Sequence, residues 1–189
     1  MVLHQCSSGW VYRGYSVLLV VADAILERLS LEVDTVFGVY GGAIAELWDA
    51  FTRQDKLKYV CPLHEQAASF MAEGYSKVHG FGVAMATSGP GGHNLVTGIA
   101  NCYYDSTPVL FITGQVATHL IRPTAELRQL GFQETPIVDI CRPITKLAIQ
   151  LRHDDNWWTE LDDAIELAKS GRPGPVLLDI PADVQRAPC

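Results

Sequence analysis

The chain is poor in the features that mark nucleic-acid binders, metal sites and hydrolases. Its 189 residues carry a net charge of −7 and no run of lysine or arginine, which argues against a nucleic-acid partner. The histidines and the five cysteines show no Cys-x-x-Cys pair and no metal-ligand spacing, so we expect no metal site in this chain. Neither a Gly-x-Ser-x-Gly elbow nor a Cys and His nucleophile pair stands out, and nothing marks hydrolysis.

Long apolar runs are also missing. The apolar run at 17–21 and the Ala22-Asp23-Ala24 after it imitate a secretory signal, but the run is too short and Asp23 interrupts it. No window is long and apolar enough to span a bilayer, so we expect no membrane segment. The cysteines are scattered and odd in number, as is typical of reduced thiols in a protein core. We therefore expect a cytoplasmic protein.

What the chain does contain is an alternation of strands and helices. Hydrophobic residues make up 48% of it, and several predicted strands are apolar throughout, which indicates a sheet covered on both faces. The pattern predicts an α/β fold, with one three-layer α/β/α domain at 16–189, a mainly parallel sheet and an N-terminal arm at 1–15. The strands are expected at 35–39, 57–61, 83–87, 108–113, 146–151 and 175–180, and the helices at 16–30, 43–51, 64–78, 93–104, 135–141 and 154–170.

Four turns rich in glycine or proline each follow one of the predicted strands. In open α/β sheets, ligands collect at the carboxyl ends of the strands. The turns therefore predict a binding site at one edge of the sheet, independent of any family. They are Gly41-Gly42, Pro62–Glu65, Ser88–Gly92 and Gly114-Gln115, the last of which opens a segment at 114–129 that we expect to contain a long loop.

Glu65 lies in the first turn of the helix at the centre of this expected site. An acidic residue there can simply stabilise the helix, because the exposed amides carry partial positive charge. It can also be catalytic, since a carboxylate at the entrance of a buried helix is partly withdrawn from water and suited to share a proton. The residues that make this helix apolar on most of its surface, as expected of a buried helix, are Ala67, Ala68, Phe70, Met71, Ala72 and Tyr75.

The other motifs near this edge also have plain alternatives. Ser88–Gly92 opens a helix and suits an anion or, better, a planar ring close to the backbone, since it lacks the lysine of a nucleotide loop. His93 and Asn94 could equally cap that helix or face solvent. Phe132-Gln133-Glu134 could be surface polarity around one anchoring phenyl ring.

Five segments in order give the chain a specific resemblance. It resembles the N-terminal pyrimidine-binding domain of thiamine-diphosphate enzymes, and within them the acetolactate (acetohydroxyacid) synthase group. The resemblance covers about residues 17–185 in collinear order. Its segments are FGVYGGAIAELWDAF, LHEQAASFMAEGYSKVHG, VAMATSGPGGHNLVTGIANCYYDSTPVLFITGQV, LGFQETPIVDICRPITK and SGRPGPVLLDIPADV.

The resemblance implies a role for each matching residue. Glu65 would hydrogen-bond the ring nitrogen of the cofactor's pyrimidine and favour its imino form, and Gln133 would contact the substrate with Phe132 beside it. Gly42 would lie near the reacting centre next to Gly41, and Gln115 would support the edge of the loop. The residues implied to line the pyrimidine pocket are Thr87, Pro90 and Asn94. One departure is that the family's usual Tyr-Pro-Gly-Gly is here Val39-Tyr40-Gly41-Gly42.

The same resemblance implies a larger enzyme. The family decarboxylates a 2-oxoacid such as pyruvate and joins the remainder to a second oxoacid, with the chemistry supplied by the cofactor. Its Mg²⁺ and diphosphate bind a Gly-Asp-Gly…Asn motif that this chain does not contain, and its synthases hold FAD in a middle domain. We therefore expect this chain alone to bind thiamine diphosphate weakly and to be inactive.

Three interpretations of the chain stay open at this point. It can be a piece of a synthase-like enzyme whose diphosphate-binding domain lies in cis, or the natural subunit of a two-chain 2-oxoacid decarboxylase completed in trans. It can also be a non-catalytic dimerisation domain. In each case we expect a homo-oligomer, because the family's site forms between subunits and an isolated domain would expose apolar helix faces.

Overall fold

Six parallel strands form one sheet in the order β2-β1-β3-β4-β6-β5, so all six carboxyl ends lie at the same edge. The computed structural model describes residues 19–189, and the arm expected at 1–15 and the start of the first predicted helix lie outside the described residues. The strands are β1 (Thr35–Gly38), β2 (Lys58–Val60), β3 (Gly82–Ala86), β4 (Val109–Gln115), β5 (Leu147–Gln150) and β6 (Val176–Pro181).

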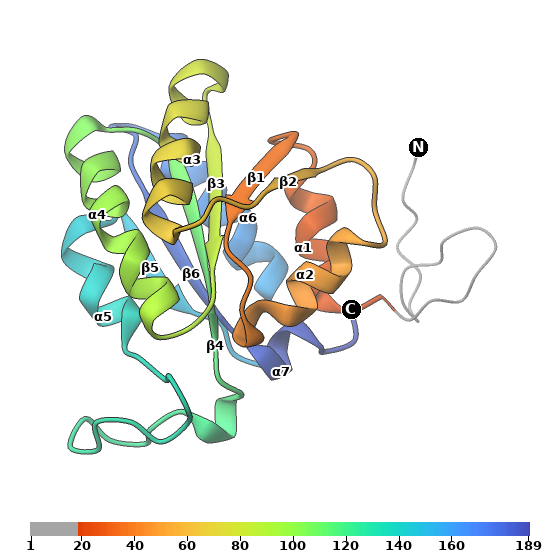
Figure 1. Ribbon diagram of the computed structural model, residues 1–189, viewed down its shortest axis with the longest axis vertical. Helices are drawn as coiled ribbons and strands as arrows, with labels where there is room; N and C mark the ends of the chain where they lie inside the picture. Colours follow the sequence, from red (N-terminus) through yellow and green to blue (C-terminus); the bar gives the residue numbers. More distant parts are fainter. Residues whose placement is uncertain (1–18) are drawn as a thin grey trace.

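Helices cover both faces of this sheet, which confirms the predicted three layers (Figure 1). One apolar cluster joins one face to α1 (Val21–Leu29), α2 (Ala45–Phe51), α6 (Trp157–Lys169) and α7 (Ala182–Gln185). A second joins the other face to α3 (Glu65–His79), α4 (Pro90–Asp105) and α5 (Ile137–Cys141). Short 3-10 helices lie at η1 (Gly42–Ile44), η2 (Thr118–Leu120) and η3 (Arg142–Ile144).

The strand sequences account for this arrangement. Every residue of β3, β4 and β6 is buried, as expected of central parallel strands covered on both sides. Side chains alternate between the two clusters along β3: Val83 and Met85 face the α1 side, and Ala84 and Ala86 face the α3 side. The edge strands β2 and β5 are partly exposed.

Helix α1 begins at Val21, although residues 19–20 were predicted to be helical, and other helices also differ from the prediction at their ends. Helix α4 begins at Pro90 and not at 93, because proline suits the first helical position, where no backbone donor is needed. Helix α6 begins at Trp157 and not at 154, because the Asn156 side chain accepts from the Thr159 amide and caps it. The four-residue α7 was not predicted. Between β4 and α5 the chain is largely irregular, as expected, and extends beyond the lower edge of the sheet in Figure 1.

The expectation that α3 is buried on most of its surface is wrong. Only one side of the helix, carrying Ala68 and Ala72, packs on the sheet and on α4. Phe70 and Met71 are each 42% exposed, and Val78 is 77% exposed. The residues are apolar as the sequence indicates, but α3 belongs to an outer layer that nothing in this chain covers within residues 19–189.

Two further expectations concern cysteine and the membrane. Cys102 and Cys141 are buried thiols, as predicted, whereas Cys61 is exposed at the end of β2. Cys6 falls outside the described part of the chain. None of the helices within residues 19–189 combines the length and apolar character that crossing a bilayer requires.

Candidate functional site

The turns after β1 and β3 touch at the carboxyl edge of the sheet. The backbone N–H of Ala43 donates to Thr87 Oγ1 at 3.2 Å. A Cβ added at Gly41 would overlap the Thr87 side chain, so only glycine allows this approach. On the other side of Thr87, a Cβ added at Gly91 would lie 2.7 Å from Thr87 Cγ2. Two of the predicted turns thus meet at one threonine, Thr87.

Glu65 is the first residue of α3 and faces this convergence. His64 caps the helix, with its Nδ1 accepting from the Gln66 amide at 3.1 Å. Asn94 Nδ2 donates to Glu65 Oε2 at 2.9 Å. The other oxygen, Oε1, would lie 3.4 Å from a Cβ at Gly91 and accepts no hydrogen bond from any residue in the 19–189 range. The side chain is half-buried, with one oxygen held and one available to a ligand.

The close packing of α3 against α4 brings these two residues together. A Cβ added at Gly98 would overlap Ser69 Oγ, so the two helices can approach this closely only with glycine there. Two turns further along, Asn101 Nδ2 donates to both carboxylate oxygens of Glu73 at 2.8 and 2.9 Å. The helices are therefore held in register along their length, and Asn94 reaches Glu65 as a consequence.

Gln133 lies against the turn that opens α4. Both Gln133 and Gly89 have left-handed backbones, with φ of 60° and 59°. A Cβ added at Gly89 would lie 2.8 Å from both Gln133 Cβ and its carbonyl oxygen. Next to this contact, His93 Nε2 lies 2.6 Å from Thr135 Oγ1. A left-handed backbone at a residue other than glycine carries strain, which is frequent at functional sites.

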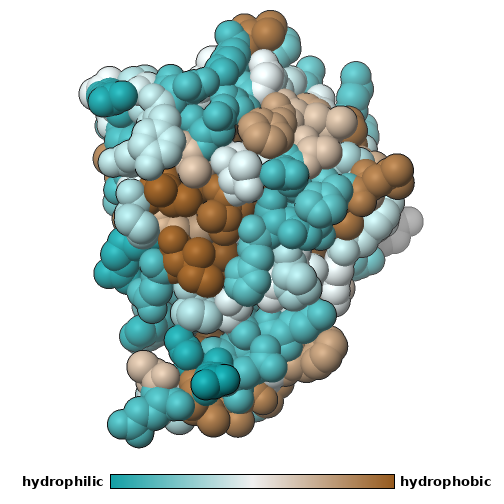
Figure 2. Space-filling model, turned by 60° about the vertical axis from the view of Figure 1, so that its left-hand side comes forward, coloured by the Kyte–Doolittle hydropathy of each residue, from teal (hydrophilic) through white to brown (hydrophobic). Residues whose placement is uncertain are grey.

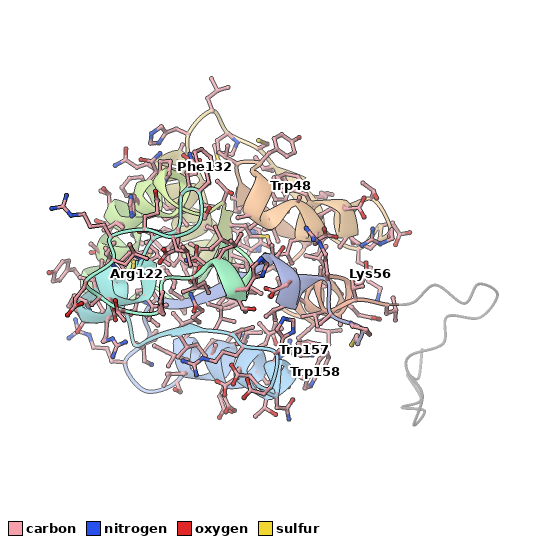
Figure 3. All side chains as sticks on the ribbon, turned by 90° about the horizontal axis from the view of Figure 1, so that it is seen from below. Trp48, Lys56, Arg122, Phe132, Trp157 and Trp158 are labelled. Carbon is pink, nitrogen blue, oxygen red and sulfur yellow. The ribbon has the colours of Figure 1, made fainter. Side chains whose placement is uncertain are left out.

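Phe132 does not anchor this segment, contrary to its interpretation as an anchoring phenyl. Its side chain is 84% exposed. Figure 3 views the molecule from the carboxyl edge and shows Phe132 at the surface, with Arg122 further along the same segment and Trp48 on α2. The ring is therefore accessible to a substrate or to another protein surface.

Gln115 is fully buried beneath residues 131–135, the Gln133 segment, and supports this segment. Its Nε2 donates to the Thr135 carbonyl at 2.9 Å and to Asp179 Oδ2 at 3.1 Å. Asp179 itself was missed by the sequence reasoning. Burial raises its pKa to about 6, although hydrogen bonds from Gln150, Thr113 and Gln115 act in the opposite direction. The only available signal was an aspartate inside the otherwise apolar strand VLLDIP.

The structure brings most of the predicted site residues to one place. Glu65, Asn94, Thr87 and Gly41 are joined by the contacts above, and Gln133 lies across the Gly89 turn from them. Gly42 has no neighbour within 4 Å of an added Cβ and borders open space, while Pro90 is exposed at the start of α4. The arrangement offers one carboxylate oxygen and closely approached glycine backbones, which suits a flat heterocycle with a ring nitrogen.

The unusual Tyr40 belongs to an aromatic cluster behind the Gly41-Gly42 turn. Its ring centroid lies 3.9 Å from that of Trp48, which in turn lies 3.6 Å from Tyr59. Burial raises the pKa of Tyr59. The ring of Tyr40 is 63% exposed, so the residue that replaces proline here presents an aromatic face beside the site.

The chain is similar in sequence to a known family and to several curated proteins. The model of the family described as "Thiamine pyrophosphate enzyme, N-terminal TPP binding domain" matches residues 19–140. Acetolactate synthase 2, chloroplastic, of Nicotiana tabacum is 45% identical over 167 residues, 87% of this chain and 24% of the relative. The mitochondrial acetolactate synthase catalytic subunit of Saccharomyces cerevisiae is 44% identical over 156 residues, 82% of this chain and 22% of the relative. The acetolactate synthase of Mycobacterium bovis is 45% identical over 170 residues, 89% of this chain and 26% of the relative.

Proposed function

The chain belongs to the family of thiamine pyrophosphate enzyme N-terminal TPP binding domains, and we propose that it holds the pyrimidine half of thiamine diphosphate in an acetolactate-synthase-like carboligase. The observation that carries this proposal is Glu65. Its carboxylate is fixed through one oxygen by Asn94, and its other oxygen faces the Gly91 backbone at the carboxyl edge of the sheet.

The residues at this edge fit a thiamine pyrimidine. The open Oε1 of Glu65 offers a proton-sharing partner to a ring nitrogen, and Asn94 keeps the carboxyl group oriented toward it. Thr87, Pro90 and Gly41 border the same space, where glycine lets a planar ring approach the backbone. Together these residues would hold the pyrimidine ring and exclude water from it.

The chain's own residues would then have distinct tasks. Bound thiamine diphosphate supplies a carbon nucleophile that adds to a 2-oxoacid and allows carbon dioxide to leave. Glu65 holds or releases a proton at Oε1, and Gln133 and Gly42 orient the substrate at the outer side of the site. A positioned proton-transfer group of this kind contributes roughly 10²–10⁴-fold to a rate.

The rest of such an enzyme lies outside what this chain provides. The chain spans about a quarter of the length of the curated relatives it matches. Within residues 19–189 no three His, Cys, Asp or Glu side chains gather as a possible metal site. We propose that a diphosphate-binding domain in cis or in trans supplies the Mg²⁺ that neutralises the diphosphate. FAD, the acceptor oxoacid and the assignment as a transferase or lyase belong to the same proposal.

Apolar surface on α3 and α4 supports a homo-oligomer. In Figure 2, hydrophobic side chains gather in patches between polar ones on the face shown. Exposed apolar surface of this extent favours association, and we propose that a second copy of the chain or its companion domain covers it. Sedimentation that stays monomeric at every concentration would contradict the homo-oligomer. The exposed apolar and aromatic residues on and beside these two helices are Leu63, Phe70, Met71, Val78, Tyr103 and Tyr104.

Complementation tests the proposed role of Glu65. Mixing this chain with the diphosphate-binding domains of a relative, Mg²⁺ and thiamine diphosphate should release carbon dioxide from pyruvate. Glu65→Gln should lower the rate at least 100-fold, because an amide cannot exchange the proton.

The matched control is Glu73→Gln, on the same helix and also paired with an asparagine of α4. It should retain most of the activity. Activity that survives Glu65→Gln would remove Glu65 from the mechanism. If all properties of the chain stay unchanged, the non-catalytic dimerisation domain becomes the better interpretation. A natural companion chain that restores activity in trans would favour the two-chain decarboxylase. The cytoplasmic location stays a prediction, since the relatives' names include chloroplastic and mitochondrial proteins.

A further inference from the structure

Three neighbouring strands place buried polar side chains in one row. Asp179 of β6 is the register partner of Thr113 in β4 and of Gln150 in β5. Its Oδ1 accepts from Thr113 Oγ1 at 2.7 Å, and its Oδ2 accepts from Gln150 Nε2 at 2.7 Å and from Gln115 Nε2 at 3.1 Å. The side chain is fully buried, and no ion pair neutralises it among the residues that the structure describes.

A carboxylate at this position does something that an asparagine could not. An ionised carboxylate only accepts hydrogen bonds, so both glutamine amides that meet it must point their NH₂ groups inward. An asparagine presents one acceptor and one donor, so it would leave these amides free to choose between two orientations. The buried charge costs stability but specifies a single arrangement of the network.

Gln115 links Asp179 to the backbone at Thr135. One Nε2 hydrogen is used by Asp179 and the other by the Thr135 carbonyl, while Oε1 accepts from the Val116 amide at 3.0 Å. All three polar positions of the amide are therefore occupied. If the Gln115 amide turned over, its oxygen would face the Thr135 carbonyl and the Asp179 carboxylate, and both hydrogen bonds would be lost.

Thr135 is the base of the strained Gln133 segment. The turn above it is closed by the Glu134 amide, which donates to the Gly131 carbonyl at 3.1 Å. The Leu130 amide donates to Glu134 Oε2 at 2.9 Å. A left-handed residue such as Gln133 persists only where its surroundings determine it, and the Thr135 carbonyl is the point at which the buried network does so.

We propose that Asp179 is a positioning residue for the substrate side of the site, holding the Gln133 segment against the Gly89 turn through Gln115 and Thr135. It touches neither substrate nor cofactor. That the positioned segment serves a thiamine site rests on the proposed function, but the coupling between Asp179 and Gln133 does not.

Other charged or titratable groups also surround this network. Gln150 lines a cavity of about 380 Å³ between α5, β5 and the start of α6, which brings solvent close to the buried carboxylate. His93 contacts Thr135 directly and is itself a titratable group. A pH measurement must separate Asp179 from these groups. They are the Cys141 thiol, which Asp179 influences, and Glu134, His93, Arg142, Arg152, Asp155 and Glu160.

Hydrogen exchange followed by mass spectrometry tests this coupling on the full chain without any cofactor. Exchange of the peptide spanning 131–137, corrected for the intrinsic effect of pH, should be slow above the Asp179 midpoint near pH 6 and faster below it. Asp179→Asn should remove this step and raise exchange above pH 6 roughly tenfold, because a charge-assisted hydrogen bond is lost. Gln115→Met should remove the step while Asp179 is intact.

Two control variants show whether the pH-dependent step in exchange belongs to Asp179. Gln150→Met removes one donor from the carboxylate but leaves Gln115 and Thr135 linked, so the step should persist at a higher pH. His93→Gln keeps a polar side chain but cannot titrate, so the step should persist unchanged. The double variant Asp179→Asn with Gln115→Met should exchange no faster than either single variant.

The outcomes separate this inference from the proposed function. A step confined to 131–137 and lost in both Asp179→Asn and Gln115→Met supports positioning by Asp179. A flat profile, a step that follows His93, or exchange rising equally in β4 and β6 in both variants overturns it. If the step holds but Glu65→Gln leaves catalysis intact, the proposed function fails while the coupling stands.

Discussion

Two carboxylates on α3 are paired with two asparagines on α4, and only one of them has an oxygen to spare. Glu73 is 4% exposed, and its oxygens are taken by Asn101 and by Lys77, which lies 2.6 Å from Oε1. Glu65 has one oxygen held by Asn94 and the other facing a glycine turn. The same side chains on the same helices thus serve different ends.

The proposed role of Glu65 rests on a feature that Glu73 lacks. If burial alone were the criterion, Glu73 would be the better candidate for a functional carboxylate, because it is the more deeply buried of the two. What distinguishes Glu65 is the unfilled acceptor position at a sheet edge where two of the turns meet. Because Glu65 is only half-buried, this oxygen stays accessible to a ligand at the sheet edge.

A third carboxylate, Asp179, extends this comparison and gives the largest expected effect on stability. Three donors saturate it, no cation pairs with it among residues 19–189, and burial raises its pKa from 3.8 to about 6. Because the folded state then binds the proton more tightly than the unfolded state, this group favours folding below about pH 4. Its contribution is lost as pH rises to 6. At 1.36 kcal/mol per pKa unit the change is about 3 kcal/mol.

Asp179→Asn removes this dependence. The difference in unfolding free energy between the variant and the wild type should shift in favour of the variant between pH 4 and pH 6, and stay level above that. Urea denaturation at pH 4.5, 5.5 and 7 measures it. Comparing the two proteins at each pH cancels the opposite effect of Asp183, whose pKa is lowered to about 2 by the Thr118 and His153 hydrogen bonds despite partial burial. A constant difference at all three pH values would contradict the expectation.

A substitution at Gly98, which lies on α4 between Asn94 and Asn101, should disturb both glutamate–asparagine pairs at once. A Cβ at Gly98 would meet Ser69, so Gly98→Ala should push α3 and α4 apart and cost about 2 kcal/mol, as overpacking does. It should also weaken thiamine diphosphate binding, since Asn94 would no longer reach Glu65. Scanning calorimetry measures the change in stability, and titration calorimetry measures the change in thiamine diphosphate binding. Gly74→Ala is the control, because a Cβ at Gly74 would meet nothing within 4 Å.

The smallest expected effect comes from comparing the two glutamate–asparagine pairs directly by alanine substitution. Glu73→Ala removes two hydrogen bonds from Asn101 and the ion pair with Lys77, whereas Glu65→Ala removes one hydrogen bond from Asn94, so Glu73→Ala should cost about 1.5 kcal/mol more. Thermal unfolding of the two variants in the same buffer measures this difference. Equal destabilisation would contradict the expectation that the Glu73 pair contributes more to stability.

The sequence was sufficient for the fold and for the sheet edge that carries the candidate site. Apolar runs located all six strands, and turns after the strands predicted the edge that carries Glu65, Thr87 and Asn94. It could not show that α3 is partly exposed, because periodicity identifies apolar residues but not what covers them. Asp179 was visible as an aspartate in an apolar strand, yet its partners come from two other strands, and one of them, Gln115, links it to the loop at Thr135. The left-handed backbone of Gln133 depends on that distant network and has no local signal.

The half-open pairing of Glu65 has a consequence for how damage at this residue would show itself. Since the helix cap is provided by His64 and the helix packing by residues further along α3, a chain altered only at Glu65 would still fold and would keep the rest of its surface unchanged. Such a variant would accumulate to normal levels and take the place of active chains. Selection for abundance or assembly would pass such a variant, and only an assay of turnover would find it.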